Sequence, residues 1–194
     1  VGLTIISARE IARDTARTLP EILAHLGGVH VRDNLGSPDR QIDMRGFGIT
    51  GDQNTLVLLD GVRLNENDLS STKLSMIPLQ SIERIEIVPG GGGVLFGTGA
   101  TGGAINIVTK TPIPNQTAGS GSVGLGSYSS ADVRAGVNRA SDNLGLALSA
   151  SHQQSEGYRR NNRLRQDSAV GDVRFVDART NVGLKFGADT QHLQ

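Results

Sequence analysis

The stretch SIERIEIVPGGGGVLFGTGATGGAINIVTK, residues 81–110, joins two β-like segments through a glycine-rich connection. Residues 83–88 and 104–110 place apolar side chains at every second position, a period that is typical of a strand with one buried face. One helical turn fits before them, at residues 78–82. Glycines between strands indicate tight turns and close backbone approach. We assign this structural role to Gly97, Gly102 and Gly103.

The same connection contains the fingerprint G-x-G-x-x-G at residues 97–102. In a dinucleotide-binding domain these glycines open a helix that holds the pyrophosphate. Here residues 103–109 are β-branched and alternating, and Pro112 would end a helix early. The sequence therefore disfavours a nucleotide-dependent enzyme, which would require a helix at residues 103–112.

Composition excludes several other classes of protein. The 194 residues include 19 basic and 19 acidic side chains, so the net charge is zero and nothing indicates a nucleic-acid partner. The absence of cysteine excludes disulfides, thiolate zinc sites and cysteine nucleophiles. The four histidines are not spaced as metal ligands or paired with a nucleophile motif. We expect no catalytic residue, no metal and no cofactor.

Upstream of this stretch the pattern indicates helices and then strands. Ser7 with Glu10 forms a capping box, and Thr18 with Glu21 repeats it before the amphipathic segment 19–26. Gly27 and Gly28 then provide a stop. Pairs of apolar residues two positions apart, as in a strand, follow at residues 29–31 and 42–44, and an apolar run follows at 55–59. Between that run and residues 62–64, Asp60-Gly61 predicts a hairpin turn.

Downstream, two prolines within residues 111–115 indicate a linker. The segments beyond it alternate apolar residues with small or polar ones, as residues 133–138, 144–150 and 181–188 do. This alternation is typical of transmembrane β-strands, and equally of a soluble sheet with one solvated face. Periodicity alone favours transmembrane strands and strands of a soluble sheet about equally.

Several motifs in order resemble the plug domain of TonB-dependent outer-membrane transporters. They are MRGFG at 44–48, VLLDGVRL at 57–64 and the quoted stretch 81–110. Family members usually read IRGFG, VLIDGV, IERIEVLRGP and GGVINIITK. The resemblance implies an α+β plug domain, a small mixed sheet with short helices, over residues 1–112. It further implies a linker at 113–116 and antiparallel strands of an incomplete transmembrane β-barrel at 117–194.

The chain departs from the family in two respects. The usual R-G-P after the IERIEV strand is Pro89-Gly90-Gly91 here, so an arginine that helps to anchor the plug in relatives is missing. No segment resembling a TonB box precedes Val1. A barrel of this family has 22 strands, with about 10 residues in each strand. The residues that follow Pro114 are too few to form it. We therefore expect a fragment of a longer protein.

The resemblance implies that the plug fills a wide barrel lumen with a polar wall. We expect a charge network between plug and barrel formed by Arg45, Glu83, Arg84 and Glu86. Ordinary exposed strand charges are the alternative, and each would contribute little stability.

Outward-facing plug loops carry ligand contacts in the family, and such loops are usually polar and mobile. By position, the ligand-binding residues are Arg45, Phe47, Gly48, Asn65, Glu66 and Asp68. Arg45 is equally suited to an anionic ligand or to bonding a neighbouring carboxylate. Asp60 and Gly61 are expected to form the hairpin turn.

The function implied is TonB-dependent uptake of a scarce ligand, such as a ferric siderophore, haem or cobalamin. The expected location is the outer membrane of a Gram-negative bacterium. Its partners would be TonB, through an N-terminal segment, and outer-membrane lipid. A stand-alone soluble plug-like binding module is the alternative, and it predicts a closed structure in which strands after residue 116 pair among themselves.

Overall fold

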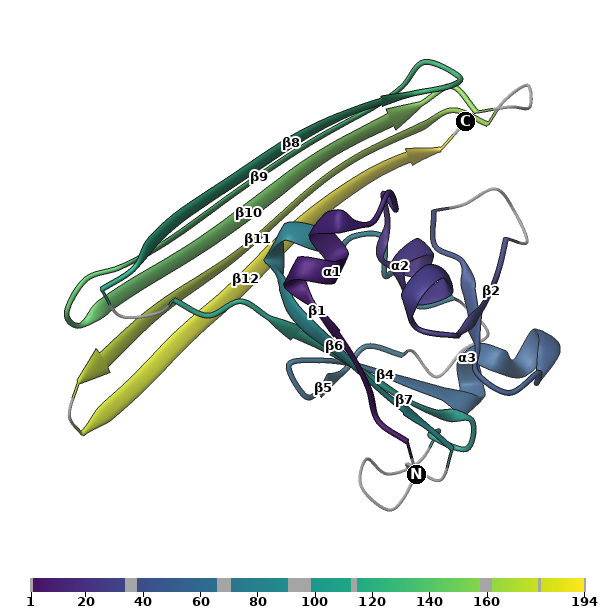
Figure 1. The fold of residues 1–194 in the computed structure, drawn as a ribbon, viewed down its shortest axis with the longest axis horizontal. Helices are drawn as coiled ribbons and strands as arrows, with labels where there is room; N and C mark the ends of the chain where they lie inside the picture. Colours follow the sequence, from purple (N-terminus) through teal and green to yellow (C-terminus); the bar gives the residue numbers. More distant parts are fainter. Residues whose placement is uncertain are drawn as a thin grey trace. The chain divides into compact units, whose positions relative to one another are not determined.

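The computed structural model describes residues 2–33, 38–65, 71–90, 99–112, 115–157, 162–177 and 179–193 (Figure 1). These residues form two compact units. The first contains Val1–Ser75 and Ile82–Thr109, and the second contains Met76–Ser81 and Lys110–Gln194. Within the described ranges no helix is both long enough and apolar enough to cross a membrane.

A mixed five-stranded sheet forms the centre of the first unit. Its order is β1 (Thr4–Ser7), β6 (Ile82–Pro89), β7 (Gly103–Thr109), β4 (Thr55–Leu59) and β5 (Val62–Arg63). Strands β4 and β7 are parallel, and the other pairs are antiparallel. The predicted mixed sheet is confirmed. Because residues 103–109 form a strand, the helix that a dinucleotide-binding loop requires is excluded.

Alternation along the two central strands creates the core. Ile85 of β6 and Ile105 and Ile107 of β7 are fully buried. Leu19, Ile22 and Leu23 of the helix α2 (Leu19–Leu26) are buried as well. Burying one such side chain contributes about 1.5–3 kcal/mol, so this apolar set provides most of the driving force for the fold.

The first two helices begin differently. Helix α1 (Ala8–Arg13) has the expected capping box: Glu10 N donates to Ser7 Oγ at 3.4 Å, and Ser7 N donates to the Glu10 carboxylate at 2.8 Å. The second predicted box is wrong, because the Thr18 side chain makes no capping bond to α2. The Glu21 carboxylate accepts instead from Arg17 N at 2.7 Å, one residue before the cap.

Short elements connect helices and sheet. Strands β2 (His30–Arg32) and β3 (Gln41–Asp43) form an antiparallel pair, followed by the 3-10 helix η1 (Gly48–Thr50) and α3 (Gly51–Asn54). The predicted turn before β6 is η2 (Leu79–Ser81). Strand β1 and the segment η1–α3 were not expected from the sequence.

The β4–β5 turn is tied to strand β7. Asp60 and Gly61 both have positive φ, at 50° and 83°. The Asp60 carboxylate accepts from Thr109 N at 2.9 Å and from Thr109 Oγ1 at 2.7 Å. The turn therefore fixes the end of the neighbouring strand as well as its own hairpin.

Asp60→Ala is expected to destabilise this region by about 1–2 kcal/mol, because it loses two hydrogen bonds and places alanine at positive φ. Amides of residues 103–109 should then exchange about tenfold faster in deuterium-exchange mass spectrometry. Asp60→Asn tolerates this φ and keeps one acceptor, so it should lose less. Equal exchange in wild type and Asp60→Ala would contradict this role.

The second unit is an antiparallel meander. Its strands are β8 (Thr117–Gly126), β9 (Ser130–Ala140), β10 (Leu144–Ser155), β11 (Leu164–Asp177) and β12 (Thr180–Leu193). Each strand pairs with the next in chain order. The described strands thus pair among themselves, but the sheet is open, with β8 and β12 at its edges.

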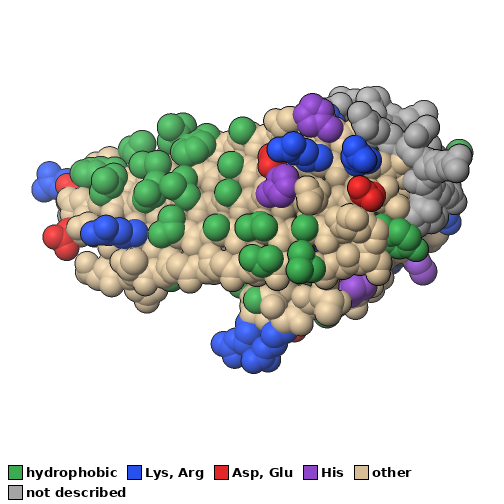
Figure 2. Space-filling view, turned by 90° about the horizontal axis from the view of Figure 1, so that it is seen from above, with side chains coloured by type: hydrophobic (Ala, Val, Ile, Leu, Met, Phe, Trp, Pro, Cys, Tyr) green, Lys and Arg blue, Asp and Glu red, His purple; other side chains and the backbone are tan. Residues whose placement is uncertain are grey.

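The strand register separates the side chains of this sheet by face. One face carries cross-strand rows of apolar residues: Leu144, Phe175 and Val182; Leu146, Val173 and Leu184; Val137, Leu148, Gly171 and Phe186; Ala135, Ala150, Ala169 and Ala188. Figure 2 shows this face as a field of apolar side chains with charged groups at its two ends. We call it the apolar face.

The opposite face carries polar and charged residues. Arg134 Nε lies 2.9 Å from the Asp132 carboxylate, and Arg174 Nη2 lies 3.2 Å from that of Asp172. Ser168 donates to Asp189 at 2.6 Å. A sheet with a continuous apolar face and a hydrogen-bonded polar face matches the pattern of transmembrane barrel strands.

Candidate functional site

The motif MRGFG forms a loop whose backbone is gathered around one carboxylate. Asp43, at the end of β3, has no exposed surface. Its Oδ1 accepts from the amides of Arg45, Gly46 and Phe47 at 3.1, 2.7 and 3.0 Å, and Oδ2 accepts from Gly48 N at 2.8 Å. Four amides directed at one carboxylate fix the conformation of the loop, which we call the motif loop (residues 44–48).

The environment of Asp43 determines its protonation state. Burial alone would raise the pKa of this carboxyl, but the amides of Gly48, Phe47, Arg45 and Gly46 outweigh burial and hold the pKa below its ordinary 3.8. The carboxylate is therefore ionised under ordinary conditions, and it matches the partial positive charge of the four amides.

A second carboxylate, Asp52, connects the motif loop region to the chain around residue 71. Its Oδ1 accepts from Ile42 N at 2.9 Å, and its Oδ2 accepts from Ser71 Oγ at 3.0 Å. Here burial dominates and raises the pKa of Asp52 above 3.8, and the Asp43 charge acts in the same direction. The two acids thus have opposite pKa shifts because Asp43 accepts more hydrogen bonds.

Three side chains of this region reach solvent from the fixed backbone. Phe47 is 37 % exposed and Ile49 is 85 % exposed, and Arg45 is exposed as well. At Gly102, an added Cβ would lie 3.2 Å from the Phe47 ring, so the absence of a side chain there leaves room for the ring. The segment thus exposes one cation and two apolar groups within five residues, and Asp43 fixes the backbone of residues 45–48.

Glycines allow the motif loop to lie against the ends of β6 and β7. At Gly103, whose φ is +148°, an added Cβ would lie 2.6 Å from the Val88 carbonyl oxygen and 2.7 Å from Met44 Sδ. At Gly90, an added Cβ would overlap the Arg45 guanidinium. Close backbone approach, expected at Gly102 and Gly103, occurs at both positions. Gly97 lies outside the described residues.

Gly90→Ala is expected to displace Arg45, because the added methyl group and the guanidinium cannot occupy the same space. The φ of +63° at residue 90 adds a cost of about 1 kcal/mol. Labelling by phenylglyoxal, read by mass spectrometry, should show higher reactivity of Arg45 in this variant. Gly46→Ala is the matched control, since its φ is +77° and nothing lies near its Cβ. Unchanged reactivity in Gly90→Ala would contradict this packing.

The structure gives Asn65 a place in the scaffold. Its Oδ1 accepts from Val57 N at 2.5 Å, and its Nδ2 donates to the carbonyls of Asp52 and Thr55 and to Thr72 Oγ1 at 3.0–3.3 Å. The amide group therefore holds strand β4 to the segments around it. Glu66 and Asp68 lie outside the described residues, so their ligand role stays a prediction.

Three of the four residues expected in a charge network between plug and barrel lie together on β6, and their contact with a barrel wall stays a prediction. Arg84 lies 2.7 Å from the Glu86 carboxylate and 2.9 Å from that of Glu83. The Asn106 amide, which donates to Glu86 at 3.0 Å, and the Arg84 guanidinium hold the pKa of Glu86 below 4.5 against burial. Arg45 lies apart from this cluster, over Gly90, and no carboxylate of the described residues is within ion-pair distance of it.

Asp43 and Asp52 were not identified from the sequence as organisers of the site. A signal for Asp43 was present, because an aspartate directly before a glycine-containing loop commonly accepts hydrogen bonds from the following amides. No group of three or more metal-ligating side chains occurs among the residues that the structure describes.

Comparison with known proteins agrees with this architecture. The sequence profile of the TonB-dependent Receptor Plug Domain matches residues 1–104. The chain is 30% identical over 192 residues to the vitamin B12 transporter BtuB of Vibrio vulnificus, covering 98% of this chain and 28% of that protein. It is 36% identical over 126 residues to the ferric enterobactin receptor PirA of Pseudomonas aeruginosa, covering 57% and 17%.

Solved structures show the same fold. The ferric enterobactin receptor PfeA aligns with a TM-score of 0.75 at 24% identity, over 98% of this chain and 33% of that one. The ferric-catecholate import receptor Fiu of E. coli K12 aligns with a TM-score of 0.79 at 22% identity, over 99% and 27%. The chain thus spans about a third or less of the length of each of these relatives. They are described as transporters and receptors.

Proposed function

The chain belongs to the TonB-dependent receptors, and we propose from that membership that the complete protein imports a scarce ligand across a bacterial outer membrane. The plug, residues 1–112, would close the lumen of a barrel that begins with the strands from residue 117, after a linker at 113–116. This proposal rests on the order of the two units along the chain, a plug fold followed by a sheet with one apolar and one polar face.

A ferric siderophore is the proposed ligand, with cobalamin and haem as the alternatives. Relatives are named for ferric enterobactin and for ferric catecholates, and a catecholate is an aromatic dianion. The motif loop offers the exposed Arg45 and Phe47, and the exposed Ile49 follows it directly. A guanidinium attracts an anion, and an aromatic ring packs against a flat ligand surface. Gly48 would contact the ligand through its backbone. Asn65 would act indirectly, by holding strand β4 to the segments around it. Glu66 and Asp68 complete the proposed contact set.

Transport would require no covalent chemistry. We propose that ligand binding at the outer face shifts the plug and releases its N-terminal segment, on which TonB then acts. The cluster of Glu83, Arg84 and Glu86 would bond the plug to the polar lumen wall, with Arg45 near the ligand instead. Within this chain the ion pairs of the cluster are largely exposed, so each contributes only about 0–1 kcal/mol to stability.

Uptake by whole cells tests the proposal. A strain lacking the complete gene should lose accumulation of one labelled ligand from a panel of ferric siderophores, cobalamin and haem. Complementation should restore accumulation, and dissipating the inner-membrane proton gradient should abolish it. Loss of uptake in the Arg45→Gln variant, with normal protein in the membrane fraction, would support the ligand role of the motif loop. Normal uptake of every ligand in the deletion strain would contradict the proposal.

A further inference from the structure

Helix α3 lies against the end of strand β3, a few residues after the motif loop. At Gly51, the first residue of α3, an added Cβ would lie 2.7 Å from the Ile42 carbonyl oxygen and 2.9 Å from Asp43 Cβ. The absence of a side chain at residue 51 therefore allows the close approach of α3 to β3. It also brings the buried Asp52 within hydrogen-bond distance of β3.

Asp52 receives hydrogen bonds from two segments that strand pairing does not join. Ile42 N, ten residues before it, donates to Oδ1 at 2.9 Å, and Ser71 Oγ, nineteen residues after it, donates to Oδ2 at 3.0 Å. Within the described ranges β3 pairs with β2 alone, and residue 71 lies outside the strands. The carboxyl group of Asp52 therefore links β3 to residue 71 where the sheets do not.

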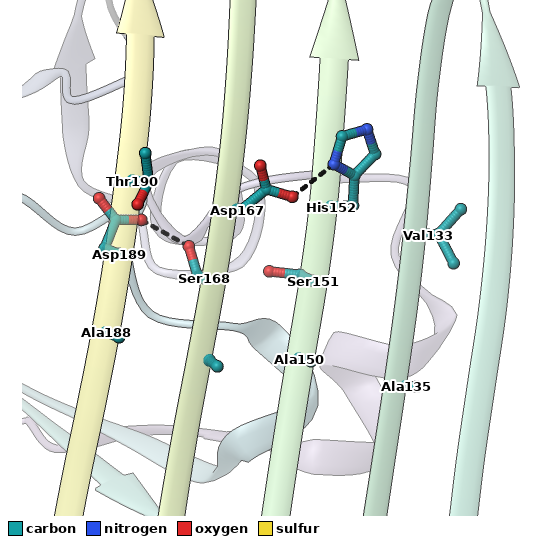
Figure 3. A pocket seen from close by; sticks show the side chains of 11 residues that line it. Val133, Ala135, Ala150, Ser151, His152, Asp167, Ser168, Ala188, Asp189 and Thr190 are labelled. Carbon is teal, nitrogen blue, oxygen red and sulfur yellow. Dashed lines mark hydrogen bonds and ion pairs between the residues drawn. The ribbon is translucent and has the colours of Figure 1, made fainter.

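Side-chain bonds in the second unit have a different setting. His152 lies 2.6 Å from the Asp167 carboxylate, and Ser168 donates to Asp189 at 2.6 Å (Figure 3). Each pair consists of direct neighbours in the strand register, so a ladder of backbone bonds already holds the two strands together. Loss of the Asp52 carboxyl would instead separate two segments that no such ladder connects in the described part of the chain.

Asn65 contacts the main chain of the same residue. Its Nδ2 donates to the Asp52 carbonyl oxygen at 3.1 Å and to Thr72 Oγ1 at 3.3 Å. Its Oδ1 accepts from Val57 N of β4 at 2.5 Å. The side chain and the main chain of Asp52 together thus connect β3, β4 and residues 71–72.

We propose that Asp52 is a positioning residue for ligand binding, which holds the motif loop at a fixed place relative to Ser71. The inference rests on the proposed function, because it takes Arg45 and Phe47 of the motif loop as ligand contacts. Asp52 is buried, and both of its carboxylate oxygens bond to the protein, so it touches no ligand itself. Its effect on binding is indirect, through the position of the loop.

The link to the motif loop runs through the end of β3. The Asp43 carboxylate accepts four amides and fixes the conformation of the loop. The bond from Ile42 N to Asp52 fixes the place of the residue before it. A ligand that binds the loop should therefore stabilise this bond and the bond from Ser71. Because such coupling is reciprocal, weaker bonds at Asp52 should weaken ligand binding by the same factor.

Asparagine at residue 52 should keep both links, whereas alanine should keep neither. The asparagine carbonyl can accept from Ile42 N, and its NH₂ group can donate to the Ser71 hydroxyl, which is both donor and acceptor. A protonated aspartic acid can make the same two bonds, and burial raises the pKa of Asp52. Rescue by asparagine thus separates the role of these hydrogen bonds from that of the charge.

Deuterium-exchange mass spectrometry of the complete receptor, with and without saturating ferric enterobactin as the probe, tests this inference. In wild type the probe should slow exchange about tenfold in residues 44–48 and also in residues 71–75. Asp52→Ala should lose the protection of residues 71–75. It should also bind the probe about tenfold more weakly, because two lost hydrogen bonds lower the population of the binding-competent arrangement by about this factor. Asp52→Asn should retain both properties.

Gln53→Ala is the matched control, because Gln53 is the exposed neighbour of Asp52 on the same helix, and its substitution should change nothing. Ser71→Ala removes one link and leaves β3 bonded to Asp52, so it should lose the protection of residues 71–75 with a smaller loss of affinity. This variant decides the question if Asp52→Ala is absent from the membrane fraction. Adding Ser71→Ala to Asp52→Ala should have no further effect, since the serine acts through the carboxyl.

Equal protection of residues 71–75 in wild type, Asp52→Ala and Ser71→Ala would overturn the inference, as would an Asp52→Asn variant that behaves like Asp52→Ala. If wild type binds cyanocobalamin or haem instead of ferric enterobactin, that compound becomes the probe in the same comparison. A wild-type receptor that binds none of the three would contradict the proposed function, and this inference with it. A receptor that binds a probe without protecting residues 71–75 contradicts this inference alone.

Discussion

Replacing Asp43 by asparagine in the complete receptor is expected to accelerate hydrogen exchange of residues 44–48 about a hundredfold. The carboxylate accepts four amide hydrogen bonds, and the asparagine NH₂ group would face an amide N–H at one of them. The three remaining bonds would lose their charge assistance. Hydrogen bonds to charged groups contribute about 1.5–3 kcal/mol each, so a net loss of about 3 kcal/mol is reasonable. Deuterium-exchange mass spectrometry of the peptide that spans the motif loop measures this change.

Asp52→Asn provides the control, because Asp52 is the neighbouring buried acid with the opposite pKa shift. Asparagine keeps an acceptor for Ile42 N and removes a charge that burial disfavours, so exchange should change little. Similar acceleration in both variants would contradict the role assigned to Asp43.

Acid should affect these two carboxyls in opposite ways. The folded-state pKa of Asp43 lies below the ordinary 3.8, so its contribution to stability is complete above that value and is lost as the pH falls through the folded pKa. The pKa of Asp52 is raised in the folded state. Its protonated form therefore contributes stability that is complete below pH 3.8 and is lost as the pH rises through the folded-state pKa. Motif-loop exchange in Asp52→Asn should therefore retain the acid sensitivity of Asp43.

Leu148→Arg is the substitution in the second unit with the largest expected effect. Leu148 lies in the middle of the apolar face, between Val137 and Gly171 of the neighbouring strands. An arginine that faces lipid at mid-depth costs a barrel about 2–4 kcal/mol. The fraction of receptor that resists urea in outer-membrane vesicles should fall accordingly.

Ser149→Arg is the matched control for that variant. Ser149 is the next residue on the same strand, and its register partners Gly136 and Val170 belong to the opposite face. Arginine on the polar face should cost far less than at residue 148. Equal losses at residues 148 and 149 would indicate that the two faces do not have different surroundings.

Alternation and turn chemistry made most of the fold predictable from the sequence. Strands β6 and β7 follow from isoleucines at every second position, and the β4–β5 hairpin follows from Asp60-Gly61. Local rules failed where distant residues compete for a partner. Glu21 bonds Arg17 N and Arg40 instead of closing the second capping box.

The candidate site was predictable only in part, because its arrangement depends on segments far apart in the chain. The motif MRGFG located Arg45 and Phe47, but the position of Arg45 over Gly90 depends on where β3 ends relative to β6. Segment η1–α3 has no apolar periodicity, and Asp52 holds it to β3. Strand β1, four residues long, is defined by pairing with β6, about 80 residues away.

Spin-label accessibility along β10 tests the central claim most directly. Single cysteines would be introduced from residue 144 to residue 151 in the complete receptor, labelled, and measured in outer-membrane vesicles by electron paramagnetic resonance. The account predicts that labels at residues 144, 146, 148 and 150 collide with oxygen dissolved in lipid, whereas labels at 145, 147, 149 and 151 do not. Uniform access to a water-soluble relaxation agent on both faces would contradict the assignment of these strands to an outer-membrane receptor.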